Sequence, residues 1–444
     1  MFLKTLFGSL VLLATFFGKY SEASGRFPTT VGLDDSFGQY DDLKIRVKIF
    51  PHKRDYLPQR KDRKRQYLRL SSDRECRIYE GAKGQAAKIF SSYHSQKEII
   101  LHSINLDTPL WIECDAPTVL HRASGLASYK YKGNFYVYRH YNLSHKEFEV
   151  VVVNILGIED YLRGVVPAEV FTSWPEESLK SQAVAARTYA LFHLSVARRA
   201  GSRPYNNFYD VNDTILFQAY TGLTDVDPRT DRAIEQTESM ILTHHNKLIQ
   251  AYYHADSGGG KTESASAVWG VDVPYARSKP EPFKSGHHRS IRWRVETDKI
   301  ALTKNLRSIG VLSSRQSVKR LAPLRKHMTS TGRVKKLLLT TNDGSYKVIS
   351  IHKLRKVITL NSNRFSMQST KDGFIFLGKG SGHGVGMNQK GSQVLAKLKG
   401  WGFERILSHY YSRTKLCSLK AGATLVTSCS ATQPQAHIKV SSEI

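Results

Sequence analysis

The amino-acid sequence predicts an α+β fold, with mostly antiparallel β regions around a central long helix. Short apolar strand candidates, separated by Gly, Asp, Pro and Ser, recur from about residue 73 to 157, a pattern typical of antiparallel sheets. One long segment then repeats small apolar residues at helical spacing. The chain has 444 residues, of which 40% are hydrophobic. This is enough for two or three domains, or for one large elaborated domain with a packed core.

The N-terminus is typical of an export signal. Lys4 precedes an apolar run that is too short to span a membrane. Ser21 and Ala23 then supply small residues at the −3 and −1 positions of a cut after Ala23. We therefore expect a signal peptide over 1–23 and a linker over 24–42. An uncleaved membrane anchor is the alternative, and either one exports the body of the protein to the periplasm or cell envelope.

Strand candidates make up an expected N-terminal β-rich region over 43–139. The first, residues 43–50, alternates apolar and basic residues. Those that follow are ECRIYEG, KIFSSY, LWIECD, FYVYRHY and FEVVVVNILG. The last of them leads into a second expected region, 140–416.

The clearest helix signal lies over about 175–199. Ser173 precedes Pro175, and Glu176 lies three residues after Ser173, which is the spacing of a capping box. The residues that repeat at helical spacing are Leu179, Ala183, Ala186 and Ala190. Small alanines on that face allow another backbone to approach closely.

The remainder of the second region alternates strands with Gly-rich loops. A strand is expected over 241–254, and SGGGKTE follows it as a Gly-rich turn. Residues 277–337 are basic and weakly patterned, and Asn342-Asp343-Gly344 is a hairpin signal. A strand, a second Gly-rich loop, a helix and a shorter helix come next, before a C-terminal tail over 417–444.

The charge of the chain requires an anionic partner. Lys and Arg number 66 against 38 Asp and Glu, a formal net charge of +28. Nucleic acid, an anionic membrane face or an acidic wall polymer would each satisfy this, but export argues against nucleic acid. The basic stretches 44–69 and 277–337 are read as contacts to wall polymer or membrane; solvated surface is the alternative reading.

The four cysteines permit disulfides in an exported protein, with three possible pairings. Cys417 and Cys429 are close enough in sequence to close a short loop. No CxxC pair and no zinc-ligand spacing occurs among the four.

Two Gly-rich loops and one acid stand out as sites for chemistry. The loops match neither the dinucleotide nor the P-loop fingerprint, so their glycines are read as allowing close approach to a bulky ligand beside His254 and His383. Glu169 is flanked by Val166 and Val170. An apolar setting disfavours the charged carboxylate, so the acid can donate a proton to a leaving oxygen. The alternative is an acid that favours a helix dipole.

The order of these stretches resembles the stage II sporulation protein D family, the SpoIID/LytB domain. The resemblance covers about 140–416. It is carried by NILGIEDYLRGVVPAEV, PEESLKSQAVAARTYAL, YYHADSGGGKTESASAVWG and GSGHGVGMNQKGSQVLAKLKGWGFERILSHYY.

The resemblance implies a peptidoglycan lytic transglycosylase, a lyase. Such an enzyme cleaves the bond between N-acetylmuramic acid (MurNAc) and N-acetylglucosamine (GlcNAc) in stem-peptide-free strands and leaves 1,6-anhydro ends. The family's catalytic acid corresponds to Glu169. A hydrolase needs two carboxylates, but here the substrate's own 6-hydroxyl attacks its anomeric carbon. One glutamate can therefore act first as acid and then as base.

The resemblance also implies a catalytic groove between loops. The substrate-binding residues expected there are Arg187, His254, Ser257, Gly258, Gly259, His383, Gly384 and Gly386. Neither a metal nor another cofactor is expected, because relatives with zinc use a Cys in the loop after the Tyr-Tyr-His strand and this loop has none. Asn388 stands where Ser is common in the family, and 277–337 looks like a basic insertion specific to this branch.

A second function fits the same family. Some relatives are described as amidase enhancers, so the chain could bind glycan strands and activate an N-acetylmuramoyl-L-alanine amidase without cutting. In both readings peptidoglycan strands are the expected partner, and such an amidase is a further candidate partner. Glu169 with its apolar flanks favours the enzyme.

Overall fold

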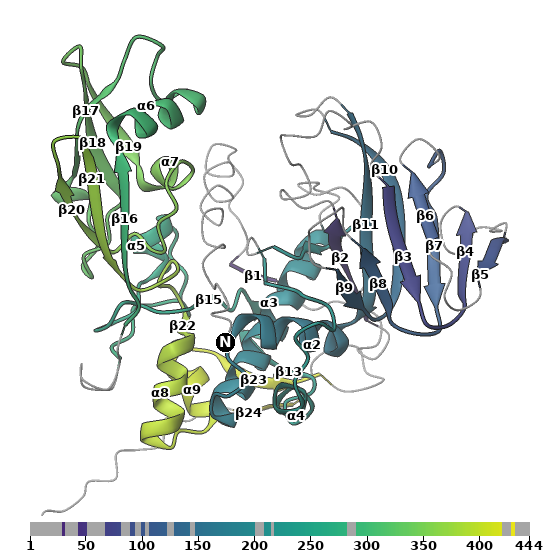
Figure 1. The fold of residues 1–444 in the computed structure, drawn as a ribbon. Coiled ribbons are helices and arrows are strands. Elements are labelled where there is room, and N and C mark those ends of the chain that lie inside the picture. Colours follow the sequence, from purple (N-terminus) through teal and green to yellow (C-terminus); the bar gives the residue numbers. More distant parts are fainter. Residues whose placement is uncertain are drawn as a thin grey trace, which may run out of the picture. The chain divides into compact units, whose positions relative to one another are not determined.

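The computed structural model describes most of the chain between residues 29 and 430 (Figure 1). The described residues are 29–31, 43–50, 67–80, 89–93, 99–102, 106–121, 128–142, 147–199, 208–214, 217–281, 290–419 and 428–430. The expected signal peptide and the most basic part of 44–69 lie outside them. So does the end of the expected tail, from residue 431.

The described part of the chain forms two compact units. The described residues of the first unit lie between Val31 and Ile241 and at 418–419 and 428. Those of the second unit are in Leu242–Cys417 and at 29–30 and 429–430. Helices and mainly antiparallel sheets occur in the chain, which confirms the α+β class. Strand β12 pairs in parallel with β2, and β15 pairs in parallel with β22.

A seven-stranded sheet dominates the first unit, in the order β12-β2-β11-β10-β7-β4-β5. Its strands are β2 (Lys44–Phe50), β4 (Cys76–Glu80), β5 (Ile89–Tyr93), β7 (Leu110–Cys114), β10 (Asn134–Asn142), β11 (Glu147–Gly157) and β12 (Val211–Asn212). In β2 the alternation predicted by the sequence is confirmed, because Ile45, Val47 and Ile49 are fully buried. A smaller sheet consists of β6 (Ile99–His102), β3 (Tyr67–Ser72), β8 (Thr118–His121) and β9 (Tyr129–Tyr131).

The structure divides the chain at a different place from the sequence. The expected boundary between 139 and 140 falls inside β10, whose antiparallel partner is β11, with Arg139 opposite Val150. The β-rich region and the start of the second region therefore share one sheet. The division between the compact units comes about a hundred residues later, within β13.

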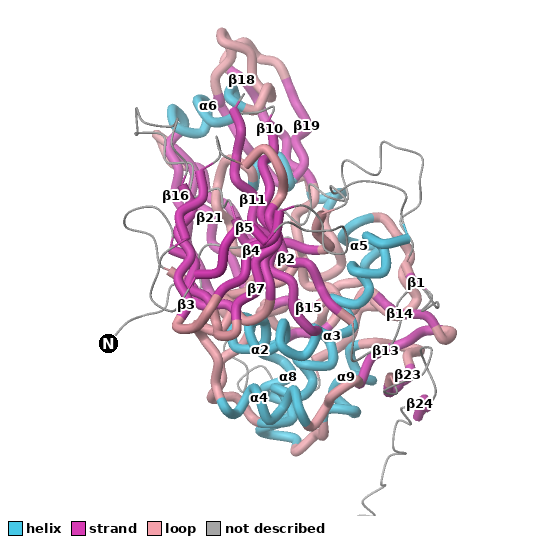
Figure 2. Tube along the Cα trace, turned by 90° about the vertical axis from the view of Figure 1, so that its right-hand side faces the viewer, coloured by secondary structure: helices cyan, strands magenta, loops and turns pink. Residues whose placement is uncertain are grey.

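The described part of the first unit also contains three helices, and Figure 2 shows α2 and α4 beyond one end of β4 and β7. They are α2 (Ile158–Glu169), α3 (Glu176–Arg199) and α4 (Pro228–Glu235). The long helix α3 confirms the helix expected over 175–199, and its four predicted core residues are fully buried. The expected capping box is wrong, because the helix starts at Glu176 and Leu179 N–H donates to Pro175 O (3.1 Å). Helix α2 was not predicted from the sequence.

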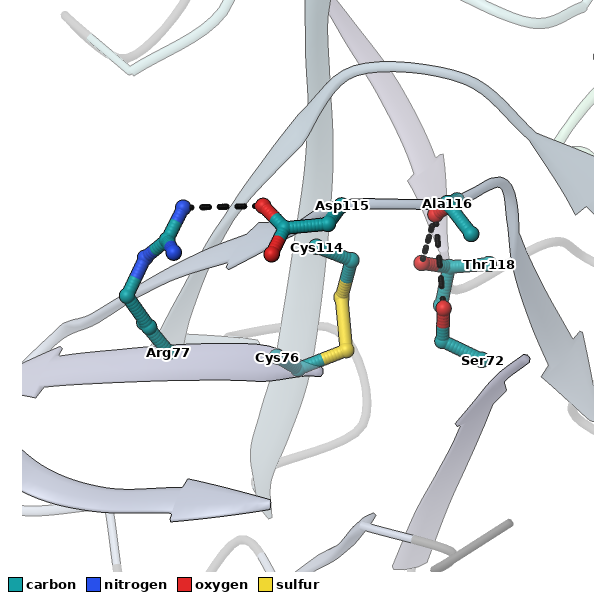
Figure 3. The surroundings of a disulfide bond; sticks show 7 residues. All are labelled: Ser72, Cys76, Arg77, Cys114, Asp115, Ala116 and Thr118. Atoms are coloured by element: carbon teal, nitrogen blue, oxygen red, sulfur yellow. Dashed lines mark hydrogen bonds and ion pairs between the residues drawn. A yellow bond between two sulfur atoms is a disulfide. The ribbon is translucent and has the colours of Figure 1, made fainter. Parts of the chain in front are cut away.

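Two disulfides are formed, Cys76–Cys114 and Cys417–Cys429. The first joins directly opposed residues of β4 and β7. Beside it, Arg77 forms an ion pair with Asp115 (2.9 Å), and Ser72 and Thr118 hydroxyls donate to Ala116 O (Figure 3). The structure thus selects one of the three pairings that the sequence left open.

The strand expected over 241–254 is instead a hairpin followed by a short strand. The hairpin consists of β13 (Met240–His244) and β14 (Lys247–Ile249), and β15 is Tyr253–His254. His245 and Asn246 have φ of 50° and 56°, as required by a two-residue turn of type I′. These strands belong to a five-stranded sheet, β1-β14-β13-β23-β24, with β1 (Thr30–Val31), β23 (Lys415–Ser418) and β24 (Ser428–Ser430).

The described residues of the basic stretch 277–337, which are 277–281 and 290–337, are folded despite the weak sequence pattern. Within the second unit, one three-stranded sheet is formed by β16 (Arg292–Asp298), β21 (Gly373–Lys379) and β20 (Phe365–Ser369). Another is formed by β17 (Val318–Pro323), β18 (Lys336–Thr341) and β19 (Tyr346–Ser350). Together with α6 (Lys299–Ser308) and α7 (Ile351–Arg355) they share a hydrophobic core that includes Trp293, Leu306, Leu339, Leu354 and Phe376. The β18–β19 hairpin confirms the turn predicted at Asn342-Asp343-Gly344.

The described part of the second unit also contains a 3-10 helix at Arg325–His327 and four further elements. The four are α5 (Ala265–Trp269), β22 (Met387–Asn388), α8 (Gln389–Lys399) and α9 (Phe403–Tyr410). The strand, Gly-rich loop and two helices expected at the end of this region are confirmed as β21, residues 380–386, α8 and α9. Among the described residues, no helix is both long and apolar enough to cross a membrane.

Candidate functional site

Glu169 is the last residue of α2. Its side chain is half-buried, and the neighbouring Val166 and Val170 are buried. Val170 N–H donates to Val166 O (3.1 Å), which ends the helix at the acid. Glu169 Oε1 accepts a hydrogen bond from Ala219 N–H (2.8 Å). A backbone donor on one carboxylate oxygen holds the side chain in place and stabilises its charged form.

Ala219 reaches Glu169 because residues 217–222 pack tightly on α2. Gly164 makes this possible: a Cβ there would lie 2.5 Å from Gly222 O and 2.6 Å from the Tyr220 ring. Thr221 N–H donates to Gly164 O (3.2 Å) across the same contact. The glycine three residues before Pro167 is therefore needed for close packing, and through that packing it positions the donor to Glu169.

Two buried tyrosines, Tyr161 and Tyr220, pack against each other near Glu169. The Tyr161 and Tyr220 rings lie 5.0 Å apart, and Tyr161 hydroxyl donates to Gln218 Oε1 (3.2 Å). Burial raises the pKa of both tyrosines well above the usual value, and the negative charge of Glu169 adds to this for Tyr161. Both phenols are therefore neutral, so they support the site without contributing charge.

Arg187 is fully buried in α3 and has internal partners. Its Nε and Nη2 atoms each donate to a carboxylate oxygen of Glu159 on α2, at 2.7 Å. Further bonds run to Met240 O (3.2 Å) and Ile234 O (3.3 Å). The observed role of Arg187 is therefore to join α3 to the helix that carries Glu169. A contact with substrate, which the sequence predicted, stays a prediction.

In the second unit the two Gly-rich loops lie side by side. Strand β15 pairs in parallel with β22, with His254 opposite Asn388. Isolated bridges join Asp256 to Ser381 and Glu263 to Val385. These pairings bring together His254, Ser257, Gly258, Gly259, His383, Gly384 and Gly386. The structure therefore places these residues close together, and that they bind substrate stays a prediction.

The two histidines bind opposite ends of one residue. His254 Nδ1 donates to Val385 O (3.1 Å), while His383 Nδ1 accepts from Val385 N–H (3.0 Å). The two rings are 5.7 Å apart, and the Trp269 ring lies 5.2 Å from His383. Burial lowers the pKa of His254 well below its usual value and that of His383 to about 3. Both imidazoles are therefore neutral hydrogen-bonding groups at physiological pH.

The glycines of these loops serve contacts within the protein. Arg333, almost fully buried, donates to Ser257 O (3.0 Å) in the first loop and to Gly382 O (3.1 Å) in the second. A Cβ at Gly384 would lie 2.7 Å from Arg333 Nη2, and the φ of +86° at Gly384 also excludes most other residues. The sequence-based reading, close approach to a bulky ligand, is thus incomplete, because the arginine itself occupies that position.

Comparison with known proteins identifies the family. Residues 146–244 match the family model described as Stage II sporulation protein (SpoIID). An uncharacterized protein of Brachyspira hyodysenteriae is 33% identical over 266 residues, 59% of this chain and 67% of that protein. Stage II sporulation protein D of Bacillus subtilis is 29% identical over 61% of this chain and 77% of that protein. The chain belongs to the stage II sporulation protein D family.

The matched family segment contains both Glu169 and Arg187. A further relative is the Amidase enhancer of Bacillus subtilis, 31% identical over 58% of this chain and 40% of that protein.

Residues 278–386 match a second model, described as Domain of unknown function (DUF8618). The basic stretch 277–337 lies almost entirely within the segment that this second model matches. That it is an insertion specific to this branch stays a prediction.

Zinc, which some family members bind, does not fit the described residues here. All four cysteines are in disulfides, so none is a thiolate ligand. No group of three or more His, Cys, Asp or Glu side chains within the described ranges could hold a metal ion. The loop after β15 thus has His254 without the second ligand that such a site needs.

Sequence reasoning missed a buried carboxyl beside the Gly-rich loops. Glu281 Oε1 accepts from Asn388 Nδ2 (2.8 Å) and Ser257 Oγ (3.3 Å), and Oε2 accepts from Tyr410 hydroxyl (2.9 Å). Burial raises the pKa of Glu281 to about 7, opposed by these hydrogen bonds. Asn388, where Ser is common in the family, also donates to Ser257 Oγ (3.1 Å) and so contacts both members of this pair. The network ties α8 and α9 to the first loop.

Glu281→Gln is expected to change the pH dependence of stability. The folded-state pKa of about 7 lies above the ordinary 4.5, so the fold favours the protonated acid. The stability that this group contributes is full below pH 4.5 and is lost as the pH rises to about 7, by up to about 3 kcal/mol. Gln resembles the protonated form, so its free energy of unfolding relative to wild type rises across that window.

Urea unfolding at a series of pH values measures this difference. Glu296→Gln is the matched control, since Glu296 is an exposed acid of the same unit with 59% of its side chain accessible. The free energy of unfolding of each variant is compared with that of wild type at the same pH. This difference removes the contribution of the buried histidines, whose lowered pKa values make stability rise with pH. A flat difference for Glu281→Gln between pH 4.5 and 7 contradicts the raised pKa.

The predicted site residues fall in two groups. Glu169 and Arg187 lie in the first unit, and the seven loop residues lie in the second. Each group is assembled by the contacts described above. That both groups line one catalytic groove stays a prediction.

Proposed function

We propose that this protein is a peptidoglycan lytic transglycosylase that cleaves the MurNAc–GlcNAc bond of stem-peptide-free strands. Membership of the stage II sporulation protein D family supports a role in the cell wall. The observation that carries the proposal is Glu169, a half-buried acid at the end of α2 with one oxygen held by Ala219 N–H. This is the position expected for the family's catalytic acid.

In this mechanism Glu169 acts twice. The protonated acid first donates its proton to the glycosidic oxygen as the C1–O bond breaks and the GlcNAc end leaves. The resulting carboxylate then takes the proton of the MurNAc 6-hydroxyl as O6 bonds to C1. One C–O bond is broken, one is formed, no water is consumed and the acid is regenerated. The Ala219 N–H bond stabilises the carboxylate between the two proton transfers.

The test is the product formed from stem-free glycan. Strands are prepared by removing the stem peptides of purified sacculi with an amidase, and they are incubated with the protein. Mass spectrometry distinguishes 1,6-anhydro-MurNAc ends from hydrolysed ends, which are heavier by one water. Anhydro ends support the proposal; reducing ends alone assign a hydrolase, and unchanged strands contradict any cutting activity.

The alternative is a glycan-binding amidase enhancer. The 31% identity to a protein named Amidase enhancer favours it. In that case the protein leaves strands uncut but increases the release of stem peptides when an N-acetylmuramoyl-L-alanine amidase is added. Measuring both products in one incubation, with and without amidase, separates the two functions.

We also propose that the protein works outside the cytoplasm, in the periplasm or cell envelope. The apolar N-terminal run and the cleavage motif before residue 24 support export. The two disulfides are consistent with an oxidising compartment.

Binding to whole sacculi is expected to weaken as salt rises, because the net charge is +28. Each basic residue near an anionic surface contributes about 1 kcal/mol, and the Debye length falls from about 8 Å at physiological salt to about 3 Å at 1 M. Neutralising the basic cluster should have the same effect at low salt. The cluster, outside the described residues, is Arg60, Lys61, Arg63, Lys64 and Arg65.

Sedimentation with sacculi at low and high salt gives the measurement. Lys397 and Lys399 in the last turn of α8 supply a control, since their neutralisation removes positive charge outside the basic cluster. Equal pelleting at both salt concentrations, for wild type and cluster variant alike, leaves the basic cluster without a binding role.

A further inference from the structure

The loop between α2 and α3 presents an exposed aromatic pair next to Glu169. Phe171 has 56% of its surface accessible, and its ring centroid lies 5.7 Å from that of the partly exposed Trp174. Phe171 follows Glu169 by two residues, so their Cα atoms are at most about 7 Å apart. Packing of the hydrophobic core does not explain why a large apolar ring is exposed to solvent beside a candidate catalytic acid.

The loop is held firmly rather than left to collapse. Trp174 N–H donates to Phe171 O (3.0 Å), which closes a turn. Arg229 Nη2 donates to Trp174 O (2.8 Å). Thr172 hydrogen-bonds through its side chain to Asp227, the residue that caps α4 by accepting from Arg229 N–H (2.8 Å). Three hydrogen bonds, one within the turn and two to residues at the start of α4, therefore hold the aromatic pair in position.

We infer that Phe171 and Trp174 form a stacking platform for one pyranose ring of the glycan, adjacent to the bond that Glu169 cleaves. The inference rests on the proposed function and adds a subsite to it. A pyranose has one face lined by C–H groups, which packs on an aromatic ring, while its hydroxyl groups stay at the rim. A rigid platform loses little conformational entropy on binding, and the pair is therefore prepared for a sugar before it arrives.

The alternative is that Phe171 is simply one of the apolar residues that every protein surface exposes. The chain offers a matched pair with which to test this. Tyr141 and Phe148, on β10 and β11 of the same unit, are also exposed aromatics, at 44% and 50%, with ring centroids 5.1 Å apart. Phe148 lies near the opposite end of β11 from α2, so its removal tests exposure without proximity to Glu169.

The experiment measures binding of stem-free glycan strands by proteins that all carry Glu169→Gln, so that cutting does not alter the ligand. Phe171→Ala is expected to weaken binding about tenfold, as for loss of an aromatic anchor. Phe171→Trp keeps a stacking surface and should bind nearly as well as the parent. Phe148→Ala should also bind like the parent. Thermal unfolding of each variant verifies that the fold is retained.

The remaining outcomes overturn the platform. Equal binding by the parent and Phe171→Ala removes the proposed subsite and leaves the transglycosylase intact. Equal weakening by Phe171→Ala and Phe148→Ala assigns a general apolar effect. If the parent binds no glycan at all, glycan recognition fails together with the platform. Anhydro-end formation by the protein with native Glu169 reports the proposed function separately in every case.

Discussion

Glu169→Gln is expected to abolish the formation of 1,6-anhydro ends from stem-free glycan. Gln keeps the shape of the side chain and can still accept from Ala219 N–H, but it has no proton to give and cannot take one from the 6-hydroxyl. Each transfer contributes roughly 10² to 10⁴ in rate. Since one residue performs both, we expect a loss of at least about a thousandfold in kcat, measured by mass spectrometry of the ends.

Glycan binding and stability should change little in this variant, because the half-buried side chain keeps its size and its backbone donor. Glu176→Gln is the matched control: Glu176 is an exposed acid in the first turn of α3, seven residues further along the chain. Its activity should equal that of wild type. Undiminished cutting by Glu169→Gln assigns the acid role to another residue and overturns the mechanism.

The sequence predicted elements whose signals are local. The small apolar residues of α3 recur at helical spacing, and the alternation in β2 has the period of a strand, so either segment could be recognised without knowing its neighbours. Helix α2 lacks such a signal. Val165, Val166 and Pro167 all disfavour helix, and the helix exists because its buried side packs on α3 and on residues 217–222.

Turn chemistry explains the hairpin that was missed. A type I′ turn is usually marked by glycine, because both central residues have positive φ. Here His245 and Asn246 take those positions, and the uninterrupted apolar and aromatic residues on either side read as one strand. Only the pairing of β13 with β14 reveals the turn.

The sequence predicted those residues of the candidate site that belong to recognisable motifs. The two Gly-rich loops could be recognised from sequence, and the structure places them together. The residues that hold them there could not, because Arg333 contacts Ser257 and Gly382 across separations of 76 and 49 residues. The pKa of Glu281 is likewise raised by burial against the lowering effect of hydrogen-bond donors such as Asn388, which is 107 residues away. No local pattern records contacts of this kind.

Glu159→Gln is expected to destabilise the protein by about 3–5 kcal/mol. It leaves the guanidinium of Arg187 fully buried with its charge no longer compensated by Glu159, which is the costly way to break a buried ion pair. Glu235→Gln is the control. Glu235 pairs with Arg163, which lies on α2 as Glu159 does, but the Glu235 side chain is 61% exposed. Its cost should stay below about 1 kcal/mol. Urea unfolding measures both values.

The double variant Glu159→Leu/Arg187→Leu then decides what Arg187 does. With neither charge buried it should regain part of the stability lost in Glu159→Gln, because two apolar side chains can pack where an ion pair stood. The cleavage of stem-free glycan is then measured at a temperature where the double variant is folded. If Arg187 only positions α2, the KM of the double variant should equal that of wild type. A large rise in KM at full folding would instead show that Arg187 contacts the substrate, as the sequence predicted. The buried bidentate geometry, with both Glu159 oxygens at 2.7 Å, favours the first result.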